Sequence, residues 1–207
     1  MKSLAEAGFM VGVWVETIVS TYSIDGMPHA AAMGCTTTDG SSILLKPFKD
    51  TKTYNNLVSR RSLVVNVCHD PVVFYKAVFD QGLTFGMARR VNAPRVLEAS
   101  AWVEAVVSEL KEFPGPRAEA LCSVIDVDLV FEKPRPYSRA EHALMEALIH
   151  FTRVRAFAGT ERHGEAEVLL ERIKYYEDLV KRVSSNQFHL SMIEKIVGEA
   201  SRLVERS

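Results

Sequence analysis

A change of pattern at residues 133–136 (KPRP) constrains the fold more than any other feature of this sequence. Before it, short runs rich in β-branched and aromatic residues are separated by turn residues, which is typical of strands. After it, apolar residues recur three or four positions apart, as in amphipathic helices. Strands followed by helices indicate an α+β fold. We therefore expect a barrel-like β domain over residues 1–134 and a helical region over residues 135–207.

Two Asp-Gly dipeptides divide the first part of the chain into three extended runs. Glycine adopts the positive φ of a tight hairpin turn, so Asp25-Gly26 and Asp39-Gly40 each predict a reversal of the chain. We expect the three runs to form an antiparallel meander of strands at residues 9–22, 28–38 and 42–48.

Three further strands are expected before the helical region, at residues 62–68, 101–113 and 118–132. In the last of them, apolar and acidic side chains alternate, as in a half-buried strand. The apolar side chains occupy odd-numbered positions, at Leu121, Ile125, Val127, Leu129 and Phe131. The acidic side chains occupy even-numbered positions, at Asp126, Asp128 and Glu132.

Two short helices are expected among these strands. One lies at residues 50–61, where Asp50 or Thr51 can cap the amino end. The other lies at residues 71–79 and has a proline in its first turn, with a strand as the alternative for this segment. Residues 81–99 contain two glycines, a proline and few periodic apolar positions. We therefore interpret them as a long irregular connection.

Three helices are expected in the second part of the chain. Ser138, with a glutamate three positions later, forms a capping box that begins the first helix, which continues to about residue 157. The second covers about residues 161–183. A second S-x-x-E sequence predicts that the third helix begins near Ser191 and continues to about residue 205.

The charge balance argues against one class of partner. The chain has 25 basic and 26 acidic residues and a formal net charge of -1, whereas dedicated nucleic-acid binders carry a basic excess. No apolar run reaches the roughly 18 residues that span a bilayer. The amino terminus lacks the pattern of a secretory signal peptide. We therefore expect a soluble, cytoplasmic protein without nucleic-acid or membrane partners.

The cysteines and histidines do not form metal-binding patterns. Cys35, Cys68 and Cys122 are odd in number, far apart and in no CxxC pair, so we expect reduced, buried thiols. No HxxxH or HExxH sequence occurs, and no pair of carboxylates has clear metal-ligand spacing. We expect no metal site.

The stretch richest in candidate ligand-binding side chains is residues 46–61 (KPFKDTKTYNNLVSRR), which carries five basic residues and one acid, Asp50. Thr51 and Thr53 lie where a strand gives way to a helix, whose first turn offers free N–H groups and the positive end of the helix dipole. These features predict a phosphate site. A capped, solvated helix with surface lysines would give the same pattern, and Asp50 would repel a phosphate unless it points away or itself caps the amides of the helix.

A second candidate is the strand at residues 28–38, because its residues 30–34 (AAAMG) have almost no side-chain bulk. Glycine in a strand often marks the close approach of another group to the backbone. A flat ring could lie on this strand and use its main-chain N–H and C=O groups. Tight packing inside a barrel would explain the same residues.

Four segments together resemble a known family. They are ETIVSTYSIDGMPHAAAMG (16–34), LLKPFKDTKTYNNL (44–57), SLVVNV (62–67) and RPYSRAEHALMEALIH (135–150). The chain is similar to the flavin reductase-like, FMN-binding split β-barrel proteins, and among them to the largely archaeal domain-of-unknown-function family 447. The resemblance spans nearly the whole chain. It implies an antiparallel FMN-binding split β-barrel followed by a C-terminal three-helix region.

The resemblance also implies FMN as cofactor and a homodimer with FMN near the subunit interface. In the family, a small-residue strand lies along the flavin ring, and a strand–loop–helix junction holds the phosphate. The matching ring residues are Ala32, Met33, Gly34, Cys35 and Thr36. The matching phosphate residues are Lys46, Thr51, Lys52 and Thr53, with Asn55 or Asn56 nearby. Asn66 lies in the match to the strand after that helix.

This chain departs from the better-known reductases of that family in two places. Their phosphate loop usually carries a serine before the threonine, whereas this chain has Thr51-Lys52-Thr53. The helical tail is absent from minimal members of the family. These departures leave the electron donor and acceptor open.

The function that the resemblance implies is an FMN-dependent oxidoreductase of unknown substrate, with a nicotinamide as one candidate electron donor. A flavin supplies the hydride chemistry itself, which explains why no catalytic residue stands out in the sequence. Three alternatives stay open. They are a flavin carrier without turnover, a split barrel that binds heme (through His29 or His69) or a deazaflavin, and a purely structural dimer.

Overall fold

The computed structural model describes residues 2–80, 82–130 and 135–206. The chain divides into two compact units. The first comprises Met1–Val11 and Val15–Tyr137 and is called the barrel unit below. The second comprises Gly12–Trp14 and Ser138–Ser207 and is called the helical unit.

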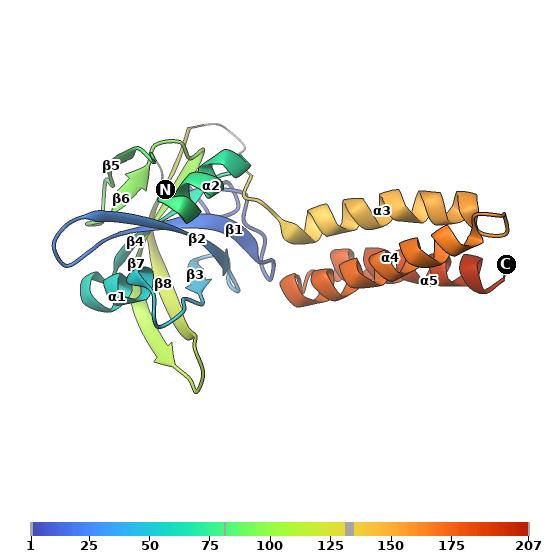
Figure 1. The fold of residues 1–207 in the computed structure, drawn as a ribbon. Helices are drawn as coiled ribbons and strands as arrows, with labels where there is room; N and C mark the ends of the chain where they lie inside the picture. The colour runs from blue at the N-terminus through green and yellow to red at the C-terminus, as the bar shows by residue number, and fades with distance from the viewer. Residues whose placement is uncertain (1, 81, 131–134, 207) are drawn as a thin grey trace. The chain divides into compact units, whose positions relative to one another are not determined.

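The barrel unit is built on a closed antiparallel barrel with the strand order β1-β2-β3-β8-β7-β4 (Figure 1). Strands that follow one another in the chain are mostly neighbours in the barrel, as expected for strands joined by tight turns. The predicted α+β fold with an antiparallel barrel is confirmed. The strands are β1 Val15–Tyr22, β2 Pro28–Thr36, β3 Ser42–Leu45, β4 Ser62–Val67, β7 Ala101–Glu112 and β8 Ala118–Leu129.

Both predicted Asp-Gly turns are present. Gly26 has a φ of 79°, and the Ser23 amide donates to the Met27 carbonyl over 2.9 Å. Gly40 has a φ of 75°. The Asp39 carboxylate accepts hydrogen bonds from the two amides that follow Gly40, each at 2.8 Å. A residue with a Cβ would be strained at either glycine.

The first strand begins at Val15, not at residue 9 as predicted. Gly12 interrupts the extended run with a φ of 75°. The Trp14 amide then donates to the Val183 carbonyl over 2.8 Å, within the helical unit. A run of β-branched residues does not reveal that residues 12–14 belong to the helical unit and not to the first strand of the barrel.

The barrel is split along one edge of β2. This strand pairs with β1 along its whole length, but with β3 only through Cys35 and Thr36. Among the residues that the structure describes, 28–34 therefore pair on one side only. The helix α1, Lys52–Arg60, buries Thr53 and Asn56 in this unit. The Asn56 amide donates to Thr21 Oγ1 of β1 over 2.9 Å, which fixes α1 beside the split.

Ile125 forms a β-bulge in β8. On the neighbouring strand β7, Glu104 pairs with Asp126, and the next residue, Ala105, pairs with Val124. Ile125 therefore has no residue opposite it. One extra residue shifts the alternation of side chains to the other face of the strand.

The predicted inward face of β8 is wrong before this bulge. There the buried residues are Ala118, Ala120 and Cys122, whereas Leu121 is only half-buried. Ile125 itself is 38% exposed. After the bulge, Val127 is buried, as predicted. Phe131 and Glu132 lie outside the described residues.

The second predicted short helix is present as α2, Pro71–Phe79. Asp70 precedes it and accepts a hydrogen bond from the Val72 amide over 2.8 Å. The segment 81–99 is not simply irregular. It contains the strands β5, Phe85–Met87, and β6, Pro94–Val96, which form an antiparallel hairpin.

A buried carboxylate on another strand anchors this hairpin. Glu104 of β7 is fully buried and accepts the amides of Arg89 and Arg90 at 2.8 and 2.6 Å. It also forms an ion pair with Arg95 of β6. Because the anchor lies outside the segment, the pattern of residues 81–99 alone does not reveal the hairpin.

The helical unit contains three helices, as predicted: α3 Arg139–Phe157, α4 His163–Val183 and α5 Gln187–Glu205. Their apolar faces share one core. Its most deeply buried residues are Ala147, Val154, Ala166, Ile173, Val180, Ile193 and Ala200. The Ser138 hydroxyl accepts the Glu141 amide over 3.3 Å, which confirms the predicted cap.

The third helix begins at Gln187, earlier than predicted. Asn186 is its cap, because the Asn186 side chain accepts the amides of Phe188 and His189 at 2.9 and 3.4 Å. Ser191, the predicted cap, lies inside α5 and donates its hydroxyl to the Phe188 carbonyl over 3.0 Å. The S-x-x-E sequence at Ser191 therefore lies inside α5, and the cap is the asparagine five positions earlier.

The cysteines are free and buried, as predicted. Burial is the main reason that the pKa of each thiol, on Cys35, Cys68 and Cys122, is raised to about 12. The folded protein therefore offers no reactive thiolate near neutral pH.

Candidate functional site

The amino end of α1 has a capped first turn. Thr51 is the cap, and its hydroxyl accepts the Tyr54 amide over 3.3 Å and donates to the Phe48 carbonyl over 2.7 Å. Thr51, and not Asp50, therefore satisfies the first turn of the helix. The amides of Lys52 and Thr53 come before the amide that the cap satisfies and belong to the free first-turn donors of a helix.

Thr53 joins α1 to the small-residue strand. Its side chain is 1% exposed, and its Oγ1 lies 3.1 Å from Nε2 of His29 on β2. His29 pairs with Thr21 of β1. Thr21 in turn accepts the Asn56 hydrogen bond described above. Two strands and the helix thus converge on His29.

A pocket of about 500 Å³ opens beside this cluster. Its walls come from the β1–β2 hairpin, from one face of α1 between Lys52 and Ser59, and from the residue that ends α2, Asp80. The lining residues are Ser23, Ile24, Met27, Pro28, His29, Lys52, Asn55, Asn56, Ser59 and Asp80.

Burial, more than the charges of the pocket, favours the neutral form of the His29 imidazole. Burial lowers the pKa of the His29 imidazole, and the charge of Lys52 lowers it further, against a smaller opposite effect of Asp80. A neutral imidazole can take up a proton when an anion enters, because an opposite charge nearby favours the protonated form.

The basic residues of segment 46–61 divide into those with structural partners and one without. Lys46 forms an ion pair with Glu119 at 2.8 Å, and Lys49 lies 3.7 Å from Glu112. The guanidinium groups of Arg60 and Arg61 donate to backbone carbonyls of Ser23, Ile24, Val107 and Ser108. Within the described part of the chain, Lys52 has no carboxylate partner, and it lines the pocket.

The residues predicted from the resemblance to lie along the flavin ring are all on β2, the strand that also carries His29. Met33 and Gly34 are half-buried on the singly paired part of β2, whereas Cys35 and Thr36 are buried where β3 joins. Thr17 Oγ1 donates to the Met33 carbonyl over 3.0 Å. Backbone and side chain in this stretch are thus held by β1.

Asn66 is engaged inside the fold. Its side chain is fully buried, and its amide group donates to the Ile18 carbonyl and to Ser20 Oγ at 2.7 and 2.8 Å. Its Oδ1 accepts the Val96 amide over 2.8 Å. Asn66 therefore joins β1, β4 and β6, and the structure does not bring it to the pocket.

The structure thus brings together Lys52, Thr53 and Asn55 of the predicted phosphate residues, but not Lys46. Sequence reasoning missed His29 as part of this cluster. A signal was present, because His29 is the one ionisable side chain in the small-residue run 28–34.

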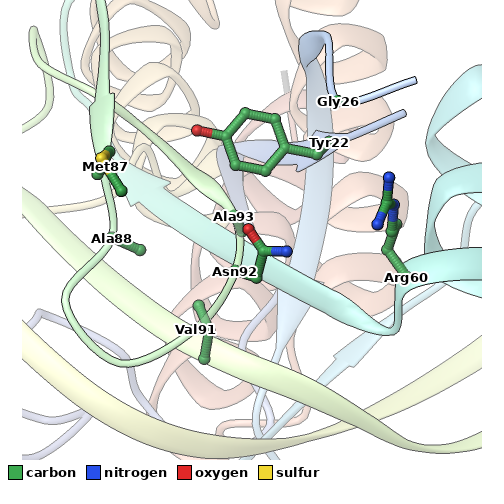
Figure 2. Close-up of a pocket in the computed structure, with 8 residues that line it drawn as sticks. All are labelled: Tyr22, Gly26, Arg60, Met87, Ala88, Val91, Asn92 and Ala93. Carbon is green, nitrogen blue, oxygen red and sulfur yellow. The ribbon is translucent and has the colours of Figure 1, made fainter. Parts of the chain in front are cut away.

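A second pocket of about 290 Å³ lies between the β1–β2 hairpin, the end of α1 and the β5–β6 connection (Figure 2). The Tyr22 ring extends toward Met87, and Arg60 lies on the opposite side of the pocket. Arg60 is the one charged residue among those that line it, and its guanidinium already binds hairpin carbonyls. The first pocket is therefore the better candidate for an anionic ligand.

The described residues form neither a metal-ligand cluster nor a membrane-spanning helix. No group of three or more histidine, cysteine or acidic side chains is placed to hold a metal ion there. None of the helices described is both long and apolar enough to cross a membrane.

Two family models match the chain. The N-terminal domain of the protein of unknown function DUF447 matches residues 15–128, and a second DUF447 model matches residues 138–197. The chain belongs to the DUF447 family. His29, Lys52 and Thr53 all lie in the part that matches the N-terminal DUF447 domain.

A solved structure from this family is similar over almost its whole length. It is an FMN-bound DUF447 protein from Methanosarcina mazei, with 25% identity and a TM-score of 0.54, covering 95% of this chain and 99% of that one. No curated protein matched this DUF447 chain.

More distant structures share the fold of the barrel unit. An NADH:FAD oxidoreductase from Streptomyces globisporus has 17% identity and a TM-score of 0.52, covering 65% of this chain and 81% of that one. A 2-nitrobenzoate 2-nitroreductase from Pseudomonas fluorescens has 15% identity and a TM-score of 0.51, covering 61% and 68%. For this DUF447 protein they establish the fold alone.

Proposed function

We propose that this DUF447 protein binds FMN in its barrel unit, with the phosphate beside Lys52 at the amino end of α1. The observation that carries the proposal is the pocket lined by Lys52, His29 and Asn55, in a family with an FMN-bound member. A helix amino end attracts phosphate because free N–H groups and the helix dipole favour negative charge there.

The residues present fit the phosphate of FMN. Lys52 supplies a cation that has no carboxylate partner among the described residues, and the amides of Lys52 and Thr53 supply first-turn donors. The pocket, about 500 Å³, is of the size that binds cofactors. Asp50 is exposed, and Thr51 is the cap of α1, so the Asp50 carboxylate does not occupy the first-turn amides that a phosphate would use.

The flavin ring lies along β2 in this proposal. The stretch from Ala30 to Gly34 has small side chains except at Met33 and pairs with β1 alone among the described residues, so its other edge can meet a flat ring. Met33 is half-buried there and offers an adaptable apolar contact.

We further propose that the protein is an FMN-dependent oxidoreductase, as distinct from a flavin carrier. Bound FMN would supply hydride and electron transfer, and the chain itself would bind and orient it. Anaerobic mixing of the FMN-loaded protein with NADH or NADPH separates the two functions. Bleaching of the flavin absorbance supports an oxidoreductase that uses a nicotinamide, and unchanged absorbance with both donors contradicts it.

The FMN site is tested by titrating the protein with FMN and with riboflavin, which lacks the phosphate. Lys52→Gln is expected to weaken FMN binding by about tenfold or more, because a hydrogen bond to a charged group contributes about 1.5–3 kcal/mol. Riboflavin affinity should stay unchanged.

Lys111→Gln serves as the matched control. It removes the same charge from an exposed pair with Glu109 on β7. Equal FMN affinity in the Lys52 and Lys111 variants would mean that the phosphate lies elsewhere. Absence of FMN binding by the unmodified protein would contradict the proposed function as a whole.

We also propose a homodimer with FMN near the subunit interface. Two large apolar side chains at the rim of the pocket, Ile24 and Met27, are 72% and 66% exposed. Val78 of α2 is 62% exposed as well. A second copy of the chain would remove this apolar surface from water.

A further inference from the structure

We infer that His29 acts with Lys52 in distinguishing FMN from flavins without a phosphate: its imidazole takes up a proton as the phosphate binds and then donates a hydrogen bond to it. This inference rests on the FMN site proposed above and adds a proton-linked selectivity to it. His29 acts here as a binding residue, and Thr53 acts as the positioning residue behind it.

The hydrogen bond to Thr53 fixes the ring of His29. Nε2 lies 3.1 Å from Thr53 Oγ1, and Thr53 is 1% exposed, so this end of the ring faces the protein interior. The imidazole nevertheless lines the pocket. Nδ1 is then the ring nitrogen left for a ligand, since the described residues give it no partner.

The charged groups that face His29 come from two elements. Lys52 of α1 and Asp80 at the end of α2 act on it, and the other pocket-lining residues carry no charge. On β1, the residue opposite His29 is the uncharged Thr21. A neutral imidazole is thus poised between a cation and an anion.

Phosphate binding changes that balance. A phosphate beside Lys52 brings negative charge close to His29, which favours the imidazolium. With the proton on Nδ1, the cation donates to a phosphate oxygen while Nε2–H donates to Thr53 Oγ1. Binding of FMN therefore takes up a proton, and by linkage its affinity rises as the pH falls from 8 to 6.

Riboflavin carries no phosphate, so its affinity should not show this dependence. The phosphate of FMN also gains a proton in this pH range, since the second pKa of a phosphate monoester is about 6. A variant without an ionisable side chain at position 29 isolates that effect. His29→Gln retains a hydrogen-bonding amide and does not titrate, so it is the matched variant.

The test measures the dissociation constants of FMN and riboflavin at pH 6, 7 and 8 for the unmodified protein and His29→Gln. The FMN-to-riboflavin affinity ratio of the unmodified protein should gain about three- to fivefold over that of the variant between pH 8 and pH 6, as expected when binding raises by about one unit an imidazole pKa that lies below 6.5 in the free protein. Equal pH profiles, with FMN bound by both proteins, would overturn the inference and leave the FMN site standing.

A second measurement covers the case in which His29→Gln does not fold. The His29 imidazole is titrated by NMR in the unmodified protein, with and without saturating FMN. A higher pKa in the FMN complex is the expected result, and an unchanged pKa overturns the inference. If the unmodified protein binds no FMN, the proposed function fails, which is a distinct outcome.

Discussion

Individual charged and polar side chains in the barrel unit divide into those that hold the fold and those that a ligand can use. Lys46 and Asn66 belong to the first group, through Glu119 and through β1 and β6. Lys52 and His29 belong to the second. The sequence shows residue types at each position, but these partners come from distant strands, so sequence reasoning grouped Lys46 and Lys52 together.

Glu104 is the polar residue with the largest expected effect on stability. It is fully buried, accepts backbone amides of the β5–β6 connection and pairs with Arg95. Glu104→Gln should lower the free energy of unfolding by about 3 kcal/mol, because the buried Arg95 then keeps Asp128, at 2.8 Å, as its one described carboxylate partner. Urea denaturation at pH 7, followed by circular dichroism, measures the difference.

The control is Glu109→Gln on the same strand, whose pair with Lys111 is about half exposed. An exposed pair contributes at most about 1 kcal/mol, so this variant should stay close to the unmodified protein. Equal loss of stability in both variants would show that Glu104 does not anchor the hairpin.

The contribution of Glu104 should also depend on pH. Burial raises the pKa of Glu104, but hydrogen bonds from the amides of Arg89 and Arg90 and the guanidinium of Arg95 outweigh burial, and the pKa is lowered below 4.5. The unfolded chain then binds the proton more readily. This stabilisation is present above pH 4.5 and is lost as the pH falls through the lowered pKa. The stability gap to Glu104→Gln should therefore narrow in acid.

Turns, caps and helices lie where the sequence predicts them when the residues that determine them are close together in the sequence. The two Asp-Gly turns, the Ser138 cap and α2 are of this kind, and all lie where predicted. The inward face of β8 before the bulge was predicted wrongly, because Ile125 is an extra residue with no partner on β7 and reverses which side chains point inward. The β5–β6 hairpin was missed because its anchor, Glu104, lies on another strand.

The start of α5 gives a test at the scale of one element. Asn186→Ala should lower the free energy of unfolding by about 1 kcal/mol, because its side chain satisfies the first-turn amides of Phe188 and His189. Ser191→Ala should change it by less than about 0.5 kcal/mol, since Ser191 bonds a carbonyl within the helix. Urea denaturation decides between the two caps, and the reverse order of effects would place the helix start at Ser191.

At the scale of the whole molecule, the order of motifs along the chain carried the sequence prediction. Family membership and the barrel followed by three helices are confirmed. The sequence could not show that residues 12–14 belong to the helical unit, because one run of β-branched residues serves both units.

The proposed homodimer predicts a particle of twice the 23.1 kDa of the chain. Sedimentation equilibrium of the FMN-loaded protein measures this mass directly. Ile24→Lys places a charge among the exposed apolar side chains at the pocket rim and should weaken the dimer, because charges are disfavoured at interface cores. A monomer that binds FMN as tightly would contradict the interface and leave the phosphate site intact.

In the proposed site the amino end of α1 holds the FMN phosphate, and a crystal structure of the protein grown with FMN would show whether it does. We expect the phosphate within hydrogen-bonding distance of Lys52 and the His29 imidazole, with the flavin ring along β2. A phosphate bound at any other place, or no bound FMN at saturating concentration, would contradict it.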